Sequence, residues 1–521
     1  MRKIQRNALA LISGGVVAVL TLTACTAGGG SKDEAVGDTS TLRMAFYQDI
    51  STPDPDTAYN GSELNLVNSA YEGLVGYEPG NSNDKITGVL ATSWTEKDNT
   101  VFTFKLRKGV TFHDGTSFTS AAIKASFDRR TAVGQGPAYM VAGVKDVATP
   151  DPNTAVITLK APNTAFLPLL ASPFGPKMVS PTAIKAHAAN NGTSWFANHD
   201  AGTGPYTYGQ FDKGTSYQLN RYANYWGPAP AYKTVNFSVV TSQSSLQLQL
   251  QGGQLDGLTT DLDKLTRAAY DKQPSLKVTT WASTLNPTLF VNPKSAFFTD
   301  AGTRRKFLSG IDLSTLVSDA LGGIAKPSDG VFPAAVLPAA LNKKDLTYSA
   351  SAWREFASRL NNRTIKIGYA TPDLVAKALS DNLVAELGKA GIKAQSIGFG
   401  TGTYYTAMSS ADAPDLTIFN GFPDTVSPEA WARVFYTPTG GLDLFGASVP
   451  GMDTLLDEGL RTGNPDAYAQ VVQQVNGSGL WFSLASLRGT AIFSTKVAGA
   501  DKAFNPVITG LIDYAKLEPT R

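Results

Sequence analysis

Cysteine and histidine are scarce in this sequence, with one cysteine and three histidines among 521 residues. The single cysteine, Cys25, excludes an intrachain disulfide. His113, His187 and His199 do not stand at the spacing of metal ligands, and they leave few ways to pair a nucleophile with a histidine base. These shortages favour binding over catalysis, and we expect no metal, no cofactor and no enzymatic activity.

The chain also lacks a large excess of either charge. It has 45 basic and 43 acidic residues, which gives a formal net charge of +2. Arg2, Lys3 and Arg6 belong to a leader segment described below, and without them 42 basic residues face 43 acidic ones. A protein this close to neutrality has no general attraction to phosphate backbones, so we expect no nucleic-acid partner.

Long apolar runs are missing except at the start, where residues 1–24 have the pattern of a targeting segment. Three cations precede a short, glycine-interrupted apolar run from Ala8 to Leu22, which favours a signal peptide over a resident membrane span. The run ends in Leu22-Thr23-Ala24-Cys25, which resembles the lipobox of bacterial lipoproteins. The resemblance implies that Cys25 is lipidated and anchors the protein outside the cytoplasmic membrane. The alternative is an ordinary secretory signal with a chance cysteine.

The body of the chain alternates predicted strands and helices. We predict a hairpin from "WTEKDNTVFTFKLRKG", with its turn at Asp98-Asn99, and later strands from "TIKIGYA", "IKAQSIGF" and "DLTIFNGF". A helix should follow Thr119, with Arg129 and Arg130 in its last turn, where cations favour the helix dipole. This alternation predicts a layered α/β fold.

His113 stands beside Asp114 and Gly115 in "TFHDGTSF". A histidine next to a carboxylate can serve as a general base, whereas Asp-Gly is a turn signal. No nucleophile or metal partner for His113 can be named, and the usual motifs of hydrolases, metalloproteases and P-loop proteins do not occur in the sequence. We therefore interpret this stretch as a turn.

The chain contains, in this order, "YEGLVGYEPG", "LATSWTEKDNTVFTFKLRKGVTFHDGTSFTSAAIKASFDR", "GTGPYTY", "NYWGPAP", "GGQLDG" and "VNPKSAFFTD". Together they resemble the peptide/nickel class, family 5, of extracytoplasmic solute-binding proteins, the receptors of ABC importers. The resemblance implies an α/β, periplasmic-binding-protein-like clamp of two lobes, with an extra domain inserted in the first lobe. It also implies that the His-Asp-Gly segment belongs to the scaffold.

The resemblance further implies limits for the parts of the chain. These are a signal peptide over 1–24, a flexible tether over 25–40, a first lobe made of 41–75, 200–290 and 490–521, an extra domain over 76–199 and a second lobe over 291–489.

One candidate ligand group lies in "FNGFPDTVSPEAW", where Asp424 stands four residues before Pro428. In peptide-binding members of the family, the aspartate of this segment pairs with the α-ammonium of the peptide, and an aromatic residue, here Phe422, accompanies it. A desolvated carboxylate suits one cation, because a charge-assisted bond replaces the lost water. The alternative is that Asp424 caps a loop or the start of a helix.

Four further residues complete the predicted site. Tyr139, in "GQGPAYM", stands where peptide binders offer a tyrosine from the extra domain, although it can equally be a packing residue. Tyr59 and Asn60 follow the first predicted strand, a usual cleft position in α/β folds. Asn286, in "WASTLNPTLFVN", lies near the presumed crossover between lobes.

The implied function is capture of a solute and its delivery to the membrane subunits of an ABC permease. We expect a monomer that binds a dipeptide or oligopeptide. The same fold with an oligosaccharide, opine or metal chelate as ligand is the first alternative, and a surface-anchored hydrolase is an alternative of another class.

Overall fold

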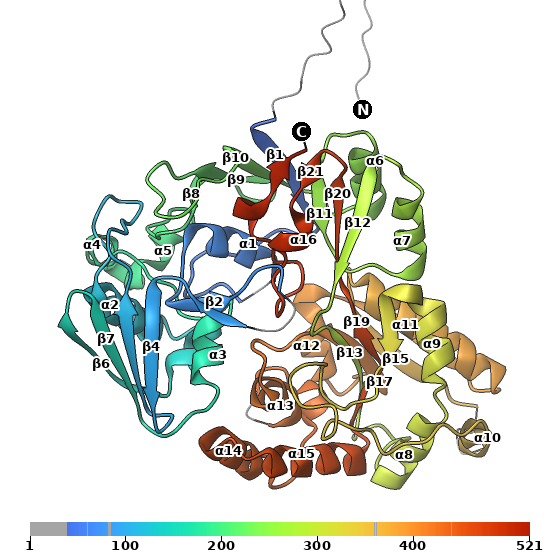
Figure 1. Ribbon diagram of the computed structural model, residues 1–521. Coiled ribbons are helices and arrows are strands. Elements are labelled where there is room, and N and C mark those ends of the chain that lie inside the picture. The colour runs from blue at the N-terminus through green and yellow to red at the C-terminus, as the bar shows by residue number, and fades with distance from the viewer. Residues whose placement is uncertain are drawn as a thin grey trace, which may run out of the picture. The chain divides into compact units, whose positions relative to one another are not determined.

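The computed structural model describes residues 39–59, 61–81, 85–358, 360, 362–438 and 440–520. For Thr401, it describes the backbone alone. Cys25, the predicted signal peptide and most of the predicted tether lie outside these residues. So does Asn60. Within the described residues, three main sheets and the helices around them account for most of the fold (Figure 1).

The first sheet has seven strands, in which the first strand of the fold lies in the middle. β1 (Thr41–Phe46) pairs in parallel with β10 (Thr234–Val239) and β11 (Gly257–Thr259), and the remaining pairs are antiparallel. Parallel strands end at one edge, so the loops after β1 and β11 lie side by side. The other strands are β8 (Tyr206–Asp212), β9 (Ser216–Arg221), β12 (Leu276–Trp281) and β20 (Gly489–Ser494).

The second sheet has five strands and contains the three late strands predicted from the sequence. β15 (Ile365–Thr371) pairs in parallel with β16 (Ala394–Gly400) and β17 (Leu416–Gly421), which confirms those predictions. β13 (Asn286–Val291) and β18 (Trp481–Ser483) complete it in antiparallel pairing. Beside it lies a two-stranded sheet of β14 (Ala325–Pro327) and β19 (Ala485–Leu487).

The third sheet is antiparallel and includes the predicted hairpin. Its order is β4 (Ala91–Lys97), β5 (Val101–Leu106), β7 (Thr154–Leu159) and β6 (Val144–Asp151). Asp98 and Asn99 have positive φ angles of 54° and 51°, as a tight hairpin turn requires, so the predicted turn is confirmed. Phe102, Phe104 and Leu106 alternate inward and are buried. Two small sheets pair β2 (Val75–Tyr77) with β3 (Ile86–Gly88) and β21 (Val497–Ala498) with β22 (Glu518–Pro519).

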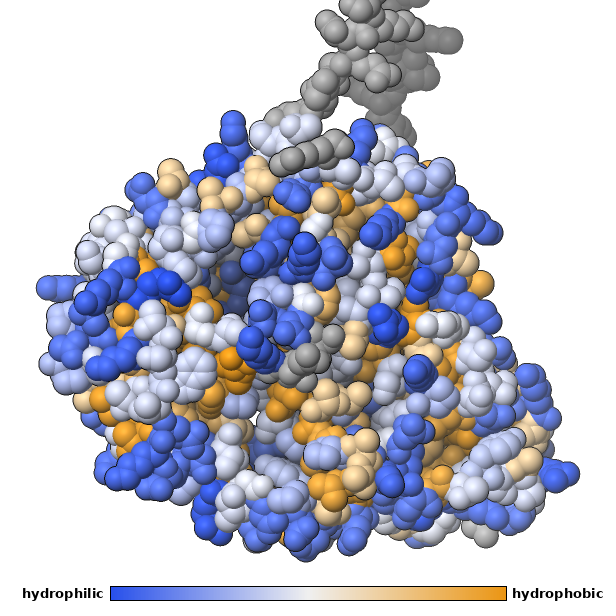
Figure 2. All heavy atoms as spheres, in the orientation of Figure 1, coloured by the Kyte–Doolittle hydropathy of each residue, from blue (hydrophilic) through white to orange (hydrophobic). Residues whose placement is uncertain are grey.

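Helices cover these sheets. The α-helices of the described residues are α1 (Gly61–Ala70), α2 (Ser120–Val133), α3 (Phe166–Ala171), α4 (Pro181–Ala186), α5 (Thr193–Phe196), α6 (Gln243–Gln251), α7 (Lys264–Asp271), α8 (Ala301–Ser309), α9 (Leu313–Ala320), α10 (Ala352–Ala357), α11 (Leu374–Lys389), α12 (Thr401–Met408), α13 (Pro428–Tyr436), α14 (Met452–Thr462), α15 (Pro465–Ser478) and α16 (Ala500–Ala503). In the described part of the chain, none of these helices combines the length and hydropathy needed to cross a bilayer. On the face drawn in Figure 2, hydrophilic side chains are spread widely and apolar ones emerge in small groups between them.

The chain passes twice between the seven-stranded and the five-stranded sheet. The first crossing joins β12 to β13, and the second runs from β18 through β19 to β20. The two crossings are hydrogen-bonded to each other, because Ser283 Oγ donates to Leu487 O at 2.6 Å and the Leu487 amide donates to Leu285 O at 3.2 Å. These paired connections are the covalent link between the two sheets.

His113 lies in a turn, as interpreted from the sequence. Gly115 has a φ angle of 80°, and its amide donates to Phe112 O at 2.9 Å. The imidazole of His113 contacts Asp200 through Nδ1 and Gly204 O through Nε2, the latter at 3.0 Å. The His113 and Asp200 side chains are 4% and 6% exposed, so the pair connects two buried backbone segments.

We expect His113→Ala to lower the free energy of unfolding by about 3 kcal/mol, because it removes one partner of a buried pair and leaves Asp200 without its imidazole. Urea denaturation measures the change. His199→Ala is the matched control, since His199 is exposed and stacks on Trp195, and its loss should change stability far less. Equal stability of the His113→Ala variant and the unchanged protein would contradict the scaffold role.

Candidate functional site

Asp424 lies where three distant segments of the chain meet. It follows β17 and precedes α13, and its side chain is 9% exposed. Its Oδ2 accepts hydrogen bonds from the hydroxyl groups of Tyr59 and Tyr139. Tyr59 comes from the loop between β1 and α1, and Tyr139 from the short 3-10 helix η1 (Gly136–Val141). The structure therefore brings three of the predicted site residues together.

The electrostatics of this cluster follow from its burial. Burial raises the pKa of Asp424, and the two tyrosine hydroxyl groups oppose that rise by donating to the carboxylate. Burial and the neighbouring carboxylate raise the pKa of Tyr59 and Tyr139 well above the ordinary value, so both remain donors. Both recorded bonds go to Oδ2, and no donor from the described residues reaches Oδ1. A cation placed at Oδ1 would complete the coordination of the carboxylate.

The backbone around Asp424 is held in place by residues far away in the sequence. Ser172 Oγ donates to Asp424 O at 2.6 Å, and the Val426 amide donates to the Tyr77 hydroxyl at 3.4 Å. The side chain of Asp424 does not cap α13, whose N-cap residue is Ser427. The capping alternative for Asp424 is therefore wrong for the side chain.

A cavity of about 230 Å³ lies at the carboxyl ends of β1 and β11, and it is lined by Phe422, two residues before Asp424. Phe422 also packs against two hydrophobic clusters, one of which contains Leu289 and the other Phe174. Ser62, two residues beyond the gap at position 60, lines the same cavity. The cavity is thus lined from both the seven-stranded and the five-stranded side of a cleft, and Phe422 connects it to the segment that carries Asp424.

Asn286 does not belong to this cleft. It is fully buried in β13, where its Nδ2 donates to Thr288 Oγ1 at 3.2 Å and its Oδ1 accepts a hydrogen bond from Ser483 Oγ. β13 pairs with strands on both sides and is buried along its whole length, so its amide serves the sheet. The prediction that Asn286 lines the ligand site is therefore not supported by its position.

Two larger hollows lie elsewhere. One, of about 300 Å³, is lined by Glu72, Lys177 and Tyr225, and the other, of about 730 Å³, lies beside Lys344 and α9. Neither is lined by Phe422 or by another residue of the segment that carries Asp424. Volume alone does not identify the site, whereas convergence of buried polar groups on one point does.

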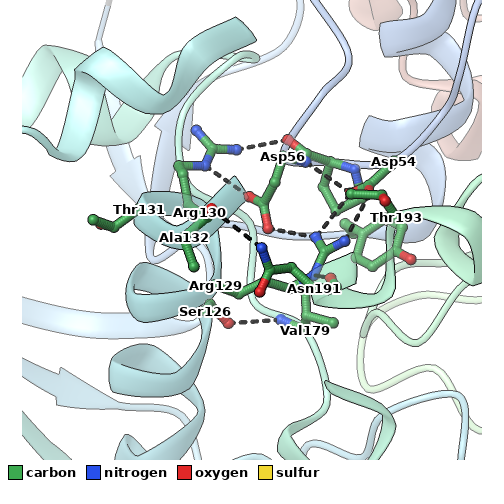
Figure 3. A network of polar contacts seen from close by, with 12 residues as sticks. Asp54, Asp56, Ser126, Arg129, Arg130, Thr131, Ala132, Val179, Asn191 and Thr193 are labelled. Carbon is green, nitrogen blue, oxygen red and sulfur yellow. Dashed lines mark hydrogen bonds and ion pairs between the residues drawn. The ribbon is translucent and has the colours of Figure 1, made fainter. Parts of the chain in front are cut away.

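A buried network of charges, which the sequence did not reveal, joins two aspartates of the loop after β1 to two arginines of α2 (Figure 3). Arg129, in α2, contacts Asp54 at 2.6 Å and Asp56, while Arg130 Nε contacts Asp56 Oδ1 at 2.8 Å. All four side chains are at most 1% exposed. Arg130 lies in the last turn of α2, as the sequence predicts, and both arginines are in addition buried in ion pairs with the two aspartates.

The network joins the loop that carries Tyr59 to the helix that precedes Tyr139. Arg130 also donates to Phe174 O at 2.7 Å, and the Phe174 ring lies edge-on to Tyr59 at 5.0 Å. Gly136 has a φ angle of 48°, and a Cβ there would lie 2.8 Å from Thr57 O, so glycine permits the close approach of η1 to this loop. Asp54, Asp56, Arg129 and Arg130 therefore act as positioning residues.

Comparison with known proteins decides the family. Residues 85–443 match the family model described as bacterial extracellular solute-binding proteins, family 5 Middle. The chain belongs to this family. Family 5 proteins are solute receptors of ABC importers, so the chain is an extracytoplasmic receptor that binds a solute for an import complex.

Individual relatives agree with this assignment. The family 5 chain is 27% identical over 402 residues to the probable D,D-dipeptide-binding periplasmic protein DdpA of Escherichia coli K12, covering 74% of this chain and 76% of the relative. It resembles the structure of DppA from Helicobacter pylori in complex with the peptide STSA, with a TM-score of 0.77 and 20% identity over 92% of this chain and 98% of that one. It also resembles NikA from Brucella suis in complex with Fe(III)-EDTA, with a TM-score of 0.80 and 20% identity over 92% and 100%. The structural likenesses establish the two-lobed family 5 fold.

We expect Asp56→Asn to lower the free energy of unfolding of this receptor by about 3–5 kcal/mol, because it leaves one buried guanidinium charge without compensation. Urea denaturation measures this change. Lys124→Ala is the control, since it removes the exposed i,i+4 pair with Asp128 on the same helix and should cost at most about 1 kcal/mol. Equal losses for the two variants would show that the buried network has no special role.

Proposed function

We propose that this family 5 receptor captures peptides with a free amino terminus and binds their α-ammonium group at Asp424. The observation that carries the proposal is the geometry of that carboxylate. Tyr59 and Tyr139 occupy Oδ2, and Oδ1 has no donor among the described residues. A cation with several N–H groups can satisfy Oδ1 and offset the desolvation of the carboxylate.

The relatives support a peptide as the ligand. DdpA is described as a probable D,D-dipeptide-binding protein, and the DppA structure holds a peptide. The NikA structure holds an iron chelate, so the fold also accepts ligands of another class. Among the described residues, no group of three or more His, Cys, Asp or Glu side chains could hold a metal ion, and a metal would therefore have to arrive within a chelate.

Binding and closure are coupled in the proposed mechanism. Tyr59 stands beside the seven-stranded sheet and Asp424 beside the five-stranded sheet, so a ligand at Asp424 contacts both sides of the cleft. Such a ligand binds the closed form better than the open form and shifts the population toward closure. The paired crossings at Ser283 and Leu487 form the hinge, and the permease subunits recognise the closed form. The peptide is released unaltered.

We extend the proposal to the organisation of the whole chain. The seven-stranded sheet forms the first lobe, the five-stranded sheet the second, and the segment with the four-stranded sheet the extra domain. The five-stranded sheet includes β13, so we place the start of the second lobe at Asn286. Residues 1–24 serve as the signal peptide, and lipidated Cys25 anchors a monomeric receptor to the outer face of the cytoplasmic membrane.

Asp424→Asn should weaken binding of a peptide with a free amino terminus by more than about tenfold, because an ammonium group loses a charge-assisted hydrogen bond. Isothermal calorimetry with a peptide mixture and with single tripeptides measures the loss. N-acetylation of the same tripeptide should weaken binding to the unchanged protein to a similar degree. It should have little further effect on the variant.

Asp412→Asn provides the control, since Asp412 is an exposed acid after α12 and outside the cleft. An unchanged affinity of Asp424→Asn for the free peptide would remove Asp424 from the site. Mass spectrometry of the solute that co-purifies with the protein tests the ligand class directly, and recovery of an opine, a sugar or a metal chelate in place of peptides would overturn the peptide assignment.

A further inference from the structure

Two more carboxylates enter the same cleft from opposite sides. Asp261 follows β11 of the seven-stranded sheet and lines the 230 Å³ cavity. Asp373 precedes α11, beside the five-stranded sheet, and its Oδ1 accepts a hydrogen bond from the Ala376 amide at 2.9 Å. Asn420, at the end of β17, donates from Nδ2 to Asp261 Oδ2 at 3.0 Å and so bridges the cleft.

These carboxylates have no positive partner. Fourteen ion-pair contacts occur in the described part of the chain, from Arg43–Asp256 to Arg433–Asp457. None of them involves Asp261, Asp373 or Asp424. Burial raises the pKa of Asp261 to about 6, and burial together with the charge of Asp261 raises the pKa of Asp373 to about 7. The closed cleft thus concentrates negative charge that the described chain does not neutralise.

An independent observation points to a ligand at this place. Thr509, from the C-terminal segment, is 8% exposed and lines the cavity with Asp261, yet its hydroxyl has no hydrogen-bond partner among the described residues. Asn420 Oδ1 is also buried without a partner. Buried polar atoms are normally satisfied, so two unsatisfied acceptors beside an unpaired carboxylate indicate a missing donor.

We propose that this cavity receives the positively charged side chain of a peptide whose α-ammonium group is bound by Asp424. Asp261 and Asp373 would neutralise the side-chain ammonium or guanidinium group, while Thr509 and Asn420 accept its remaining N–H bonds. Phe422 lies two residues before Asp424 and lines the cavity, so it supplies an apolar wall between the two cation sites. The substrate class is therefore peptides that contain lysine, arginine or a related basic residue, and this inference rests on the proposed function.

A matched peptide series tests the proposal on the full-length protein after removal of bound solute. Tripeptides of alanine carry lysine at position 1, 2 or 3, and each is compared by calorimetry with its norleucine counterpart, which has a side chain of similar length without the ammonium group. We expect the lysine peptide to bind at least about tenfold more tightly at one position, and arginine at that position to retain the preference.

Variants then locate the preference. Asp261→Asn and Asp373→Asn should each reduce it to less than about threefold while the affinity for the norleucine peptide changes little. The exposed Asp412→Asn should preserve it. The comparison of lysine with norleucine on the unchanged protein stands even if a variant fails to fold. Equal binding of the two peptides at all three positions overturns this inference and leaves the proposed function intact, whereas absence of binding by every peptide overturns both.

The pH dependence supplies a second readout. Tyr47 and Tyr404 both face Asp373. Lys377, in α11, is paired with Asp381 and lies near Tyr369 and Asp263. A carboxyl group with a raised pKa favours the closed form at low pH and opposes closure as pH rises through that pKa, unless a cation is bound. The preference for lysine over norleucine should therefore grow between pH 5 and pH 8, and a preference that is constant over this range contradicts the proposal.

Discussion

A carboxylate that is removed from water must find partners, and this requirement organises the cleft of the receptor. The hydrogen-bond donors to the Asp424 carboxylate come from residues more than 280 positions away in the sequence. Tyr59 and Tyr139 can reach it only when the loop after β1 and the helix η1 lie together against the five-stranded side. The position of one acid thus depends on the arrangement of all three sheets, so the cluster forms only in the folded protein.

The scaffold also contains buried carboxylates, but there the chain itself supplies the opposite charges. Asp54 and Asp56 are even more completely buried than Asp424, but two guanidinium groups compensate their charges (Figure 3). A compensated network of this kind is rigid, because any displacement exposes an unpaired charge to a medium of low polarity. It therefore suits a positioning role. The loop with Tyr59 and the segment with Tyr139 are fixed to each other before any ligand arrives, and the motion is left to the hinge at Ser283 and Leu487.

The sequence predicted the parts of this arrangement that depend on local patterns. The alternation of Phe102 and Phe104 identified a strand, and Asp114-Gly115 identified a turn. The order of motifs pointed to the family and, through it, to Asp424 and Tyr139, whereas Tyr59 was predicted from its position after the first strand of an α/β fold. Pairings between distant segments leave no such pattern. Arg129 looked like an ordinary residue at a helix end, and nothing near Thr509 indicates that the C-terminal segment folds back to line the cleft. Asn286 is bonded within its sheet, and a polar residue at a strand start can contribute to either the sheet or a site, which the sequence does not distinguish.

Comparison of the buried acids separates structure from function. Where the chain supplies the counter-charge, as Arg129 and Arg130 do, the acid contributes to the fold and needs nothing from outside. Where it supplies only neutral donors, as Tyr59, Tyr139 and Asn420 do, the desolvation of the carboxylate is offset in part, and the closed form without ligand is penalised. In the proposed mechanism, a cationic ligand removes that penalty in the closed form, where carboxylates from both sides surround it. Unpaired charge in the cleft would then couple closure to the binding of a cationic ligand.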